Sequence, residues 1–107
     1  MARLVNIGVT EMYGTVARIK TKPGMEAKLK EAMKKFDTRY VPGAINAYMY
    51  RTDANPDEYY LVAVFQDKDT YLANAESPEQ DKEYNQLREL LVADPEWHDG
   101  EIVYSSR

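Results

Sequence analysis

Hydrophobic residues recur along the chain either at every second position or at every third to fourth position, and these two spacings predict strands and helices in turn. Residues 12–20 alternate with a period of two, with Tyr13, Thr15, Ala17 and Ile19 on one face, which indicates a strand. After the turn signal at residues 22–24, apolar residues recur every three or four positions, which predicts a helix that ends at residues 41–43. Its apolar stripe comprises Met25, Leu29, Ala32, Met33 and Phe36.

Two further strands are predicted over residues 44–52 and 58–66, because both segments are rich in Tyr, Val, Ile and Phe. The segment between them, 53–57, contains Asp, Asn and Pro, so we expect a hairpin. Both faces of the second strand are largely apolar, which predicts that this strand is covered on both sides.

Capping signals place two helices in the second half of the chain. Asp67 can cap a short helix that extends to about residue 75. Ser77, Pro78 and Gln80 form a capping box with proline at the first helical position, which predicts a longer helix that stops at residues 93–95. We expect the last strand at residues 101–105, with residues 95–100 in the turn that precedes it.

The resulting order, β-α-β-β-α-α-β, predicts an α+β domain with a ferredoxin-like, antiparallel sheet and helices on one face. The other face would carry the valines at positions 16, 62, 64 and 103. Burying apolar surface contributes about 25 cal/mol per Å², so we predict a homodimer that pairs through this face. Residues 12–107 are expected to form this single domain, and residues 1–11 an N-terminal arm or an extra strand.

Composition narrows the classes of function. The 107 residues fit one domain, and the net charge of −4 argues against a nucleic-acid-binding protein. The absence of cysteine excludes thiolate chemistry, and a single histidine, His98, excludes a two-histidine metal site within one chain. No apolar run approaches the roughly 20 residues of a membrane span, and the first residues lack a signal-peptide pattern. We therefore expect a cytoplasmic protein, with His98 in a turn and Trp97 as an interface anchor.

Several short motifs, in this order and spacing between residues 12 and 105, resemble the antibiotic biosynthesis monooxygenase family. They are Val16-Ala17-Arg18-Ile19-Lys20, Lys22-Pro23-Gly24, Pro42-Gly43, an aromatic residue that ends the third strand, Asp67-Lys68-Asp69 and Ser77-Pro78-Glu79. The resemblance implies a dimeric α+β barrel, with a pocket between the sheet and the helices of each subunit.

The same resemblance implies two kinds of oxidative chemistry. Some members of the family are cofactor-free monooxygenases of quinols or polycyclic phenols, and others degrade haem. The haem-degrading branch carries Asn, Trp and His at positions that here hold Ala17, Phe65 and Asn74. Haem degradation is therefore not expected, and neither a metal nor a cofactor is predicted.

The cofactor-free activity requires a bound ring and hydrogen bonds to a developing anion. The resemblance implies Asn74 and Tyr71 as catalytic residues, with Phe65 holding the ring and the small Ala17 leaving room for it. Tyr48 and Leu61 complete the predicted substrate-binding set.

Each of these residues also has a simpler interpretation. Phe65 and Tyr71 are compatible with plain core packing, Asn74 with a solvated or capping position, and Tyr48 with packing in a barrel or an interface. The corresponding alternative function is a non-catalytic dimer that binds a small ligand or takes part in a stress response.

Overall fold

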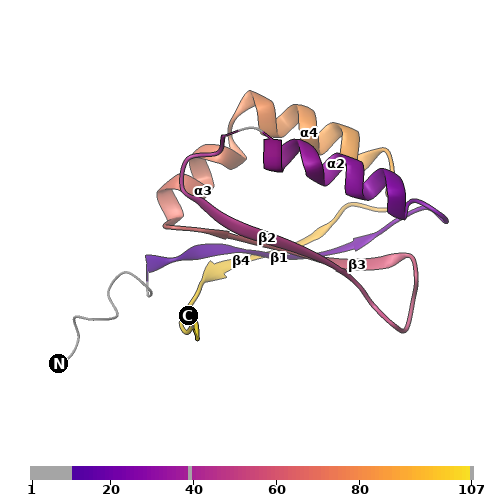
Figure 1. The fold of residues 1–107 in the computed structure, drawn as a ribbon, viewed down its shortest axis with the longest axis horizontal. Helices are drawn as coiled ribbons and strands as arrows, with labels where there is room; N and C mark the ends of the chain where they lie inside the picture. The colour runs from indigo at the N-terminus through magenta and orange to yellow at the C-terminus, as the bar shows by residue number, and fades with distance from the viewer. Residues whose placement is uncertain (1–10, 39, 107) are drawn as a thin grey trace.

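The computed structural model describes residues 11–38 and 40–106, and in these ranges the chain forms one sheet with helices above it (Figure 1). The predicted arm or strand at residues 1–11 lies outside the described residues, except for Glu11. The elements are β1 (Tyr13–Lys20), α2 (Glu26–Thr38), β2 (Ala44–Arg51), β3 (Glu58–Phe65), α3 (Lys68–Ala75), α4 (Pro78–Arg88) and β4 (Glu96–Glu101).

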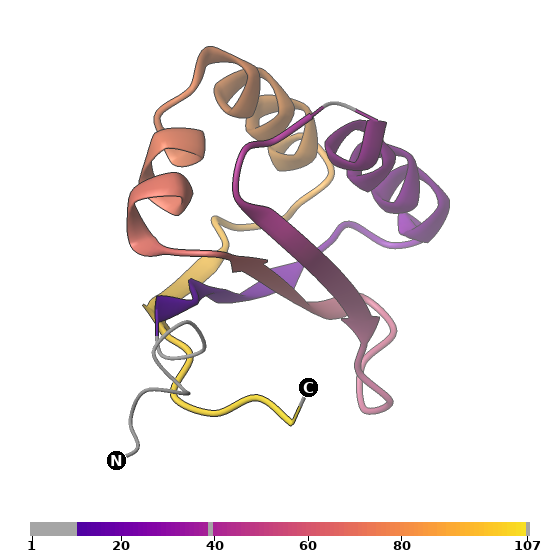
Figure 2. The same cartoon turned by 60° about the vertical axis from the view of Figure 1, so that its left-hand side comes forward.

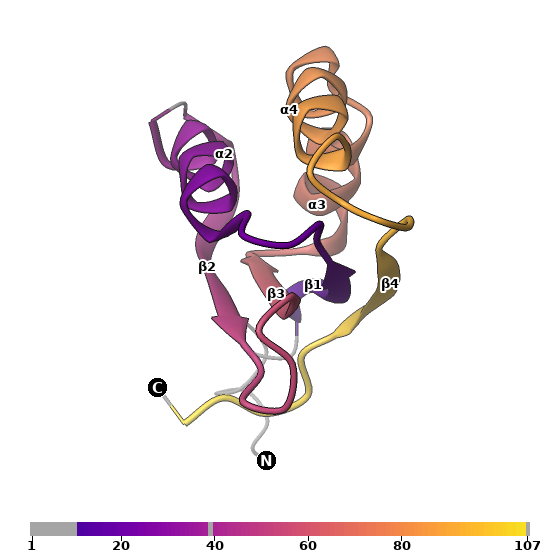
Figure 3. The same cartoon turned by 90° about the vertical axis from the view of Figure 1, so that its right-hand side faces the viewer.

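The four strands lie in the order β2-β3-β1-β4, and every neighbouring pair is antiparallel. β3 lies between β1 and β2, the two strands that α2 connects, which is the split β-α-β arrangement. This topology confirms the predicted α+β class with a ferredoxin-like, antiparallel sheet. All three helices lie on the same face of the sheet. α2 lies over its β2 edge, and α3 and α4 lie towards its β4 edge (Figure 3).

Both predicted helix caps in the second half of the chain are present. The Asp67 carboxylate accepts a hydrogen bond from the Thr70 backbone N–H at 2.8 Å, and this bond holds the pKa of Asp67 below its usual value. The Ser77 hydroxyl accepts from the Gln80 backbone N–H at 3.1 Å, directly before Pro78. These two caps fix where α3 begins and where α4 follows it.

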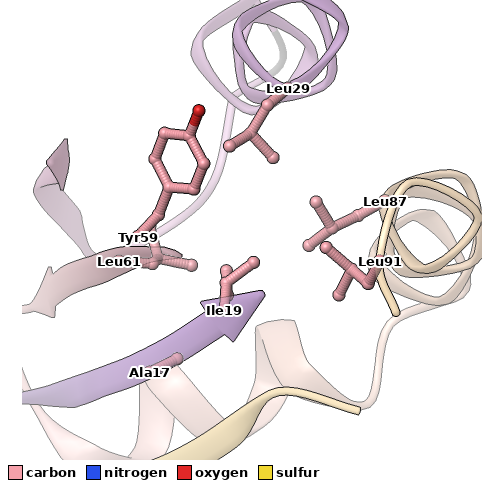
Figure 4. Packing of buried hydrophobic residues seen from close by; sticks show 7 residues of the cluster. All are labelled: Ala17, Ile19, Leu29, Tyr59, Leu61, Leu87 and Leu91. Carbon is pink, nitrogen blue, oxygen red and sulfur yellow. The ribbon is translucent and has the colours of Figure 1, made fainter. Parts of the chain in front are cut away.

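The core lies between the sheet and the helices (Figure 4). The two central strands present alternate side chains to it, as their periodicity predicts, and α2, α4 and the segment after α4 close it from above. The buried cluster consists of Ala17, Ile19, Leu29, Tyr59, Leu61, Leu87 and Leu91.

The predicted last strand was wrong by about five residues. β4 spans Glu96–Glu101, and Trp97, which was expected in a turn, pairs with Ala17 of β1. The segment carries almost no hydrophobic pattern because β4 is an exposed edge strand, where polar side chains are tolerated. Val103, expected on the open face of the sheet, instead follows the strand and is exposed.

The sheet face away from the helices, here called the back face, is open in the single chain (Figure 2). A row of directly paired residues crosses it, formed by Tyr48, Val62, Val16 and His98. Val16 is 41% and Tyr48 is 62% exposed. The predicted cover on both sides of β3 is therefore absent within one chain, because the described helices all lie on the other face.

Within the described residues, no helix combines the length and the apolar character that a membrane crossing requires.

Gly14 and Gly100 face each other across β1 and β4, and their substitution tests the packing of the central strand. A Cβ on Gly14 would overlap the backbone carbonyl of Ala63, whereas a Cβ on Gly100 would meet no atom within 4 Å. We expect Gly14→Ala to lower the free energy of unfolding by about 2 kcal/mol or more, because the clash is with backbone. Gly100→Ala should stay within about 0.5 kcal/mol of wild type. Urea denaturation measures both, and equal stability of the two variants would contradict the described β1–β3 packing.

Candidate functional site

A cavity of about 450 Å³ lies between the sheet and the helices, within the volume range of small-molecule sites. All three described helices contribute to its walls, together with side chains from each strand. Most of the wall is apolar, with Leu61 and Phe65 on the sheet side and Met33 and Leu87 on the helix side. Its polar side chains come from β1, α3 and β4 and from the first half of α4: Thr15, Tyr71, Asn74, Asp99, Gln80, Asp81 and Glu83.

Four of the six residues predicted for the site line this cavity: Leu61, Phe65, Tyr71 and Asn74. Ala17 does not line it, because its side chain is completely covered within the core. Tyr48 lies on the back face, one position out of phase with Ala47, which does line the cavity. The structure therefore brings the two predicted catalytic residues together with Phe65 and Leu61. Ala17, the direct strand partner of Leu61, is covered by the core, and Tyr48 lies on the opposite face of the sheet.

Tyr71 is held by three contacts from three different strands. Its ring meets Phe65 edge to face, with 5.5 Å between the ring centroids, and lies 5.3 Å from the ring of Tyr13. Its hydroxyl donates a hydrogen bond of 2.9 Å to the carboxylate of Asp99 in β4. The position of the Tyr71 hydroxyl is thus set by β4 as well as by its own helix.

Burial raises the pKa of Tyr71 to about 12, and the hydrogen bond to the negatively charged Asp99 acts in the same direction. Tyr71 is therefore protonated throughout the physiological range. Its one proton lies in the bond to Asp99, so in this arrangement the phenol oxygen faces other groups as an acceptor.

Asn74 is oriented by the junction between α3 and α4. Its side-chain nitrogen donates to Gln80 at 3.2 Å, and its backbone carbonyl accepts from the N–H of Ser77 at 3.0 Å. The cap that starts α4 therefore also fixes the last turn of α3, from which Asn74 reaches the cavity wall.

Among the wall residues that sequence reasoning did not assign to the site are Thr15, Trp97 and Asp99. Thr15 and Asp99 are direct partners across β1 and β4, and Trp97 packs against Tyr84 of α4 with 6.4 Å between the rings. An alternation of Trp97 and Asp99 is visible in the sequence, and it would have placed both on one face of an edge strand. Because the hydrophobic pattern predicts the last strand at residues 101–105, both residues fall in the predicted turn before it instead.

The charged side chains that line the cavity are all acidic. Asp81, Glu83 and Asp99 are part of it, whereas among the described residues no Lys, Arg or His lines it. His98, which stands next to Asp99 in the sequence, pairs with Val16 and lies on the back face. The only imidazole of the chain therefore does not reach the cavity. Over the described ranges, no cluster of three or more His, Asp and Glu is arranged to hold a metal ion.

Comparison with solved structures shows that this fold occurs in proteins of very low sequence identity. A structure of a SnoaB variant, described as a cofactor-independent oxygenase from Streptomyces nogalater, superposes with a TM-score of 0.77 at 18% identity, over 90% of this chain and 97% of that one. A conserved protein from Methanosarcina mazei gives 0.76 at 18% identity, over 87% and 94% of the two chains. Rv0793 from Mycobacterium tuberculosis gives 0.73 at 16% identity, over 90% and 99%.

The sequence itself carries the family signal. A comparison with curated proteins found no match. The family model described as antibiotic biosynthesis monooxygenase matches residues 12–83, about two thirds of the chain. The matched range contains Thr15, Phe65, Tyr71 and Asn74 of the cavity wall. On this evidence the chain belongs to the antibiotic biosynthesis monooxygenase family.

Proposed function

We propose that this protein is a cofactor-independent monooxygenase that acts on a small aromatic phenol or quinol. The observation that carries the proposal is the cavity of about 450 Å³, which combines apolar and aromatic walls with two hydrogen-bonding side chains, Tyr71 and Asn74. The fold is also similar to that of SnoaB, described as a cofactor-independent oxygenase.

In the proposed site, Phe65 and Leu61 hold the ring of the substrate. Asn74 donates a hydrogen bond to the oxygen on which negative charge develops when the substrate loses its hydroxyl proton. Tyr71, whose own proton lies in the bond to Asp99, accepts from the substrate hydroxyl and thereby positions it. Such groups are effective because α3, Asp99 and Gln80 orient them before the substrate arrives. The apolar walls exclude water from the ring.

The reaction balances without a further reductant. The aryl oxide anion gives one electron to O₂, and the two radicals combine into a peroxide on a ring carbon. The peroxide takes up the proton that left the substrate, its O–O bond breaks, and water leaves with the hydrogen of that carbon. One oxygen atom stays as a carbonyl, so the substrate supplies all four electrons and is oxidised to a quinone.

The proposed activity predicts O₂ uptake with quinols and anthrones in buffer that contains a chelator. Replacing a donor to a developing anion lowers turnover by about 100-fold or more, so we expect losses of this order for Asn74→Ala and smaller losses for Tyr71→Phe. Tyr40→Phe makes the same chemical change at an exposed loop residue and should leave the rate unchanged. An oxygen electrode measures all four proteins.

Equal background rates for wild type and Asn74→Ala would exclude the proposed enzyme. In that event, a rise in melting temperature with the same compounds would favour the non-catalytic ligand-binding function instead, since a ligand that binds only the folded state stabilises it.

We also propose that two copies pair through the back face. The centre of its row of paired residues is formed by Val16 and Val62, and Val16 and Tyr48 are exposed. Beside this row, Arg18 forms ion pairs with Glu58 and Glu96. The bond from Arg18 holds the pKa of Glu58 below its usual value, so both partners are charged at neutral pH. Residues 102–106 run on the same side of the sheet, away from the helices (Figures 2 and 3).

The proposed pairing predicts a dimer at micromolar concentration in sedimentation experiments. Val62→Glu should shift the population towards monomer, because it places a charge beside Val16 at the centre of the back face. Lys30→Glu changes an exposed residue on α2 and should leave the dimer intact. A wild-type protein that sediments as a monomer would contradict the proposed pairing.

A further inference from the structure

The hydroxyl of Thr15 is the one buried side-chain polar atom of the described residues that lacks a hydrogen-bond partner. The residue is only 5% exposed and lines the cavity. A buried polar group without a partner costs about 1–3 kcal/mol, and Thr15 lies on the central strand, where water does not reach it freely. A binding partner that enters through the cavity would remove this cost.

Tyr71 lies next to Thr15 and offers the complementary group. Thr15 is the direct strand partner of Asp99, the residue to which the Tyr71 hydroxyl donates, so this pairing brings the two hydroxyl groups into the same region. The Tyr71 proton points to Asp99, so the phenol oxygen has lone pairs to accept a hydrogen bond. Thr15 can donate and Tyr71 can accept, and both line the cavity.

Asp99 fixes the direction in which the Tyr71 hydroxyl points its proton. A carboxylate only accepts hydrogen bonds, so the bond of 2.9 Å requires Tyr71 to be its donor. Without Asp99, the Tyr71 hydroxyl could turn its proton towards a bound molecule. The carboxylate also adds negative charge to a wall that already includes Asp81 and Glu83, with no cationic side chain among the described lining residues. This charge opposes anionic groups on a ligand.

We infer that Thr15, Tyr71 and Asp99 together form the binding site for a hydroxyl group of an uncharged aromatic ligand. The ligand hydroxyl accepts from Thr15 and donates to Tyr71, and Asp99 is a positioning residue that keeps Tyr71 as an acceptor. This inference rests on the proposed function in that it treats the cavity as the substrate site. It adds two specificity residues, Thr15 and Asp99, and a preference for a free hydroxyl over an ether or a carboxylate.

The test compares three probes of similar size, 1-naphthol, 1-methoxynaphthalene and 1-naphthoate, by titration calorimetry at pH 7. One or two neutral hydrogen bonds correspond to a difference in affinity of about five- to tenfold. We expect wild type to prefer the naphthol over the ether by this factor, and to bind the naphthoate most weakly. Failure of wild type to bind 1-naphthol, or equal affinities for the naphthol and the ether, would overturn the inference.

Thr15→Val and Thr15→Ser form the matched pair of variants. Thr15→Val should remove most of the preference for the naphthol and leave the affinity for the ether unchanged, whereas Thr15→Ser should retain the preference. Without ligand, Thr15→Val should be at least as stable as wild type in urea, because it removes an unpartnered hydroxyl. A purely structural role of Thr15 would give the opposite result, a less stable protein with an unchanged ratio of affinities, and would overturn the inference.

Asp99→Ala provides a measurement at an exposed residue that does not depend on the fate of the Thr15 variants. Tyr71 should then be able to donate to the ether oxygen, so the ratio of naphthol to ether affinity should fall towards one. An unchanged ratio would overturn the positioning role of Asp99. Binding of 1-naphthol with the expected ratios, but without any O₂ uptake from the quinol panel, would exclude the proposed activity and leave this inference intact.

Discussion

The alternation of side chains along β1 is the constraint on which the rest of the structure depends. β1 is bonded on both edges, to β3 and to β4, so its register determines which residues of both neighbours face the helices. Thr15 faces the cavity together with Asp99, whereas Val16 faces away together with His98. A shift by a single residue would exchange these two sets, because successive side chains of a strand point to opposite faces.

The cavity and the open face are thus two sides of the same few strands. On one side, helices cover the sheet incompletely and leave a space bounded by Phe65, Tyr71 and Asn74. On the other side, no described helix covers the row that contains Val16 and Val62. A substitution on one face therefore acts on a strand that also shapes the other, and the activity and assembly measurements are best made on the same variants.

Local signals in the sequence predicted most of the elements, because those signals are strong at short range. The caps at Asp67 and Ser77 and the apolar stripe of α2 are contained in windows of a few residues, and the helices begin close to where these signals lie. β4 was misplaced because an exposed edge strand needs no apolar face, and its side chains are indeed polar at most positions.

The site was predictable only in part, for the same reason. Tyr71 and Asn74 sit on a helix whose start is marked in the sequence, so their shared position followed from the family resemblance and the helical period. The bond between Tyr71 and Asp99 joins residues 28 positions apart and depends on how β4 pairs with β1. No local pattern encodes that pairing, and the missing partner of the Thr15 hydroxyl becomes visible only when the core is assembled.

The position of Trp97 has a practical consequence. It is the only tryptophan of the chain, and its half-exposed indole forms part of the cavity wall beside Tyr84. Indole emission under selective excitation therefore originates from this wall alone. A guest molecule that displaces solvent from the indole should change the colour and intensity of that emission, so the protein carries an intrinsic optical reporter of its own occupancy.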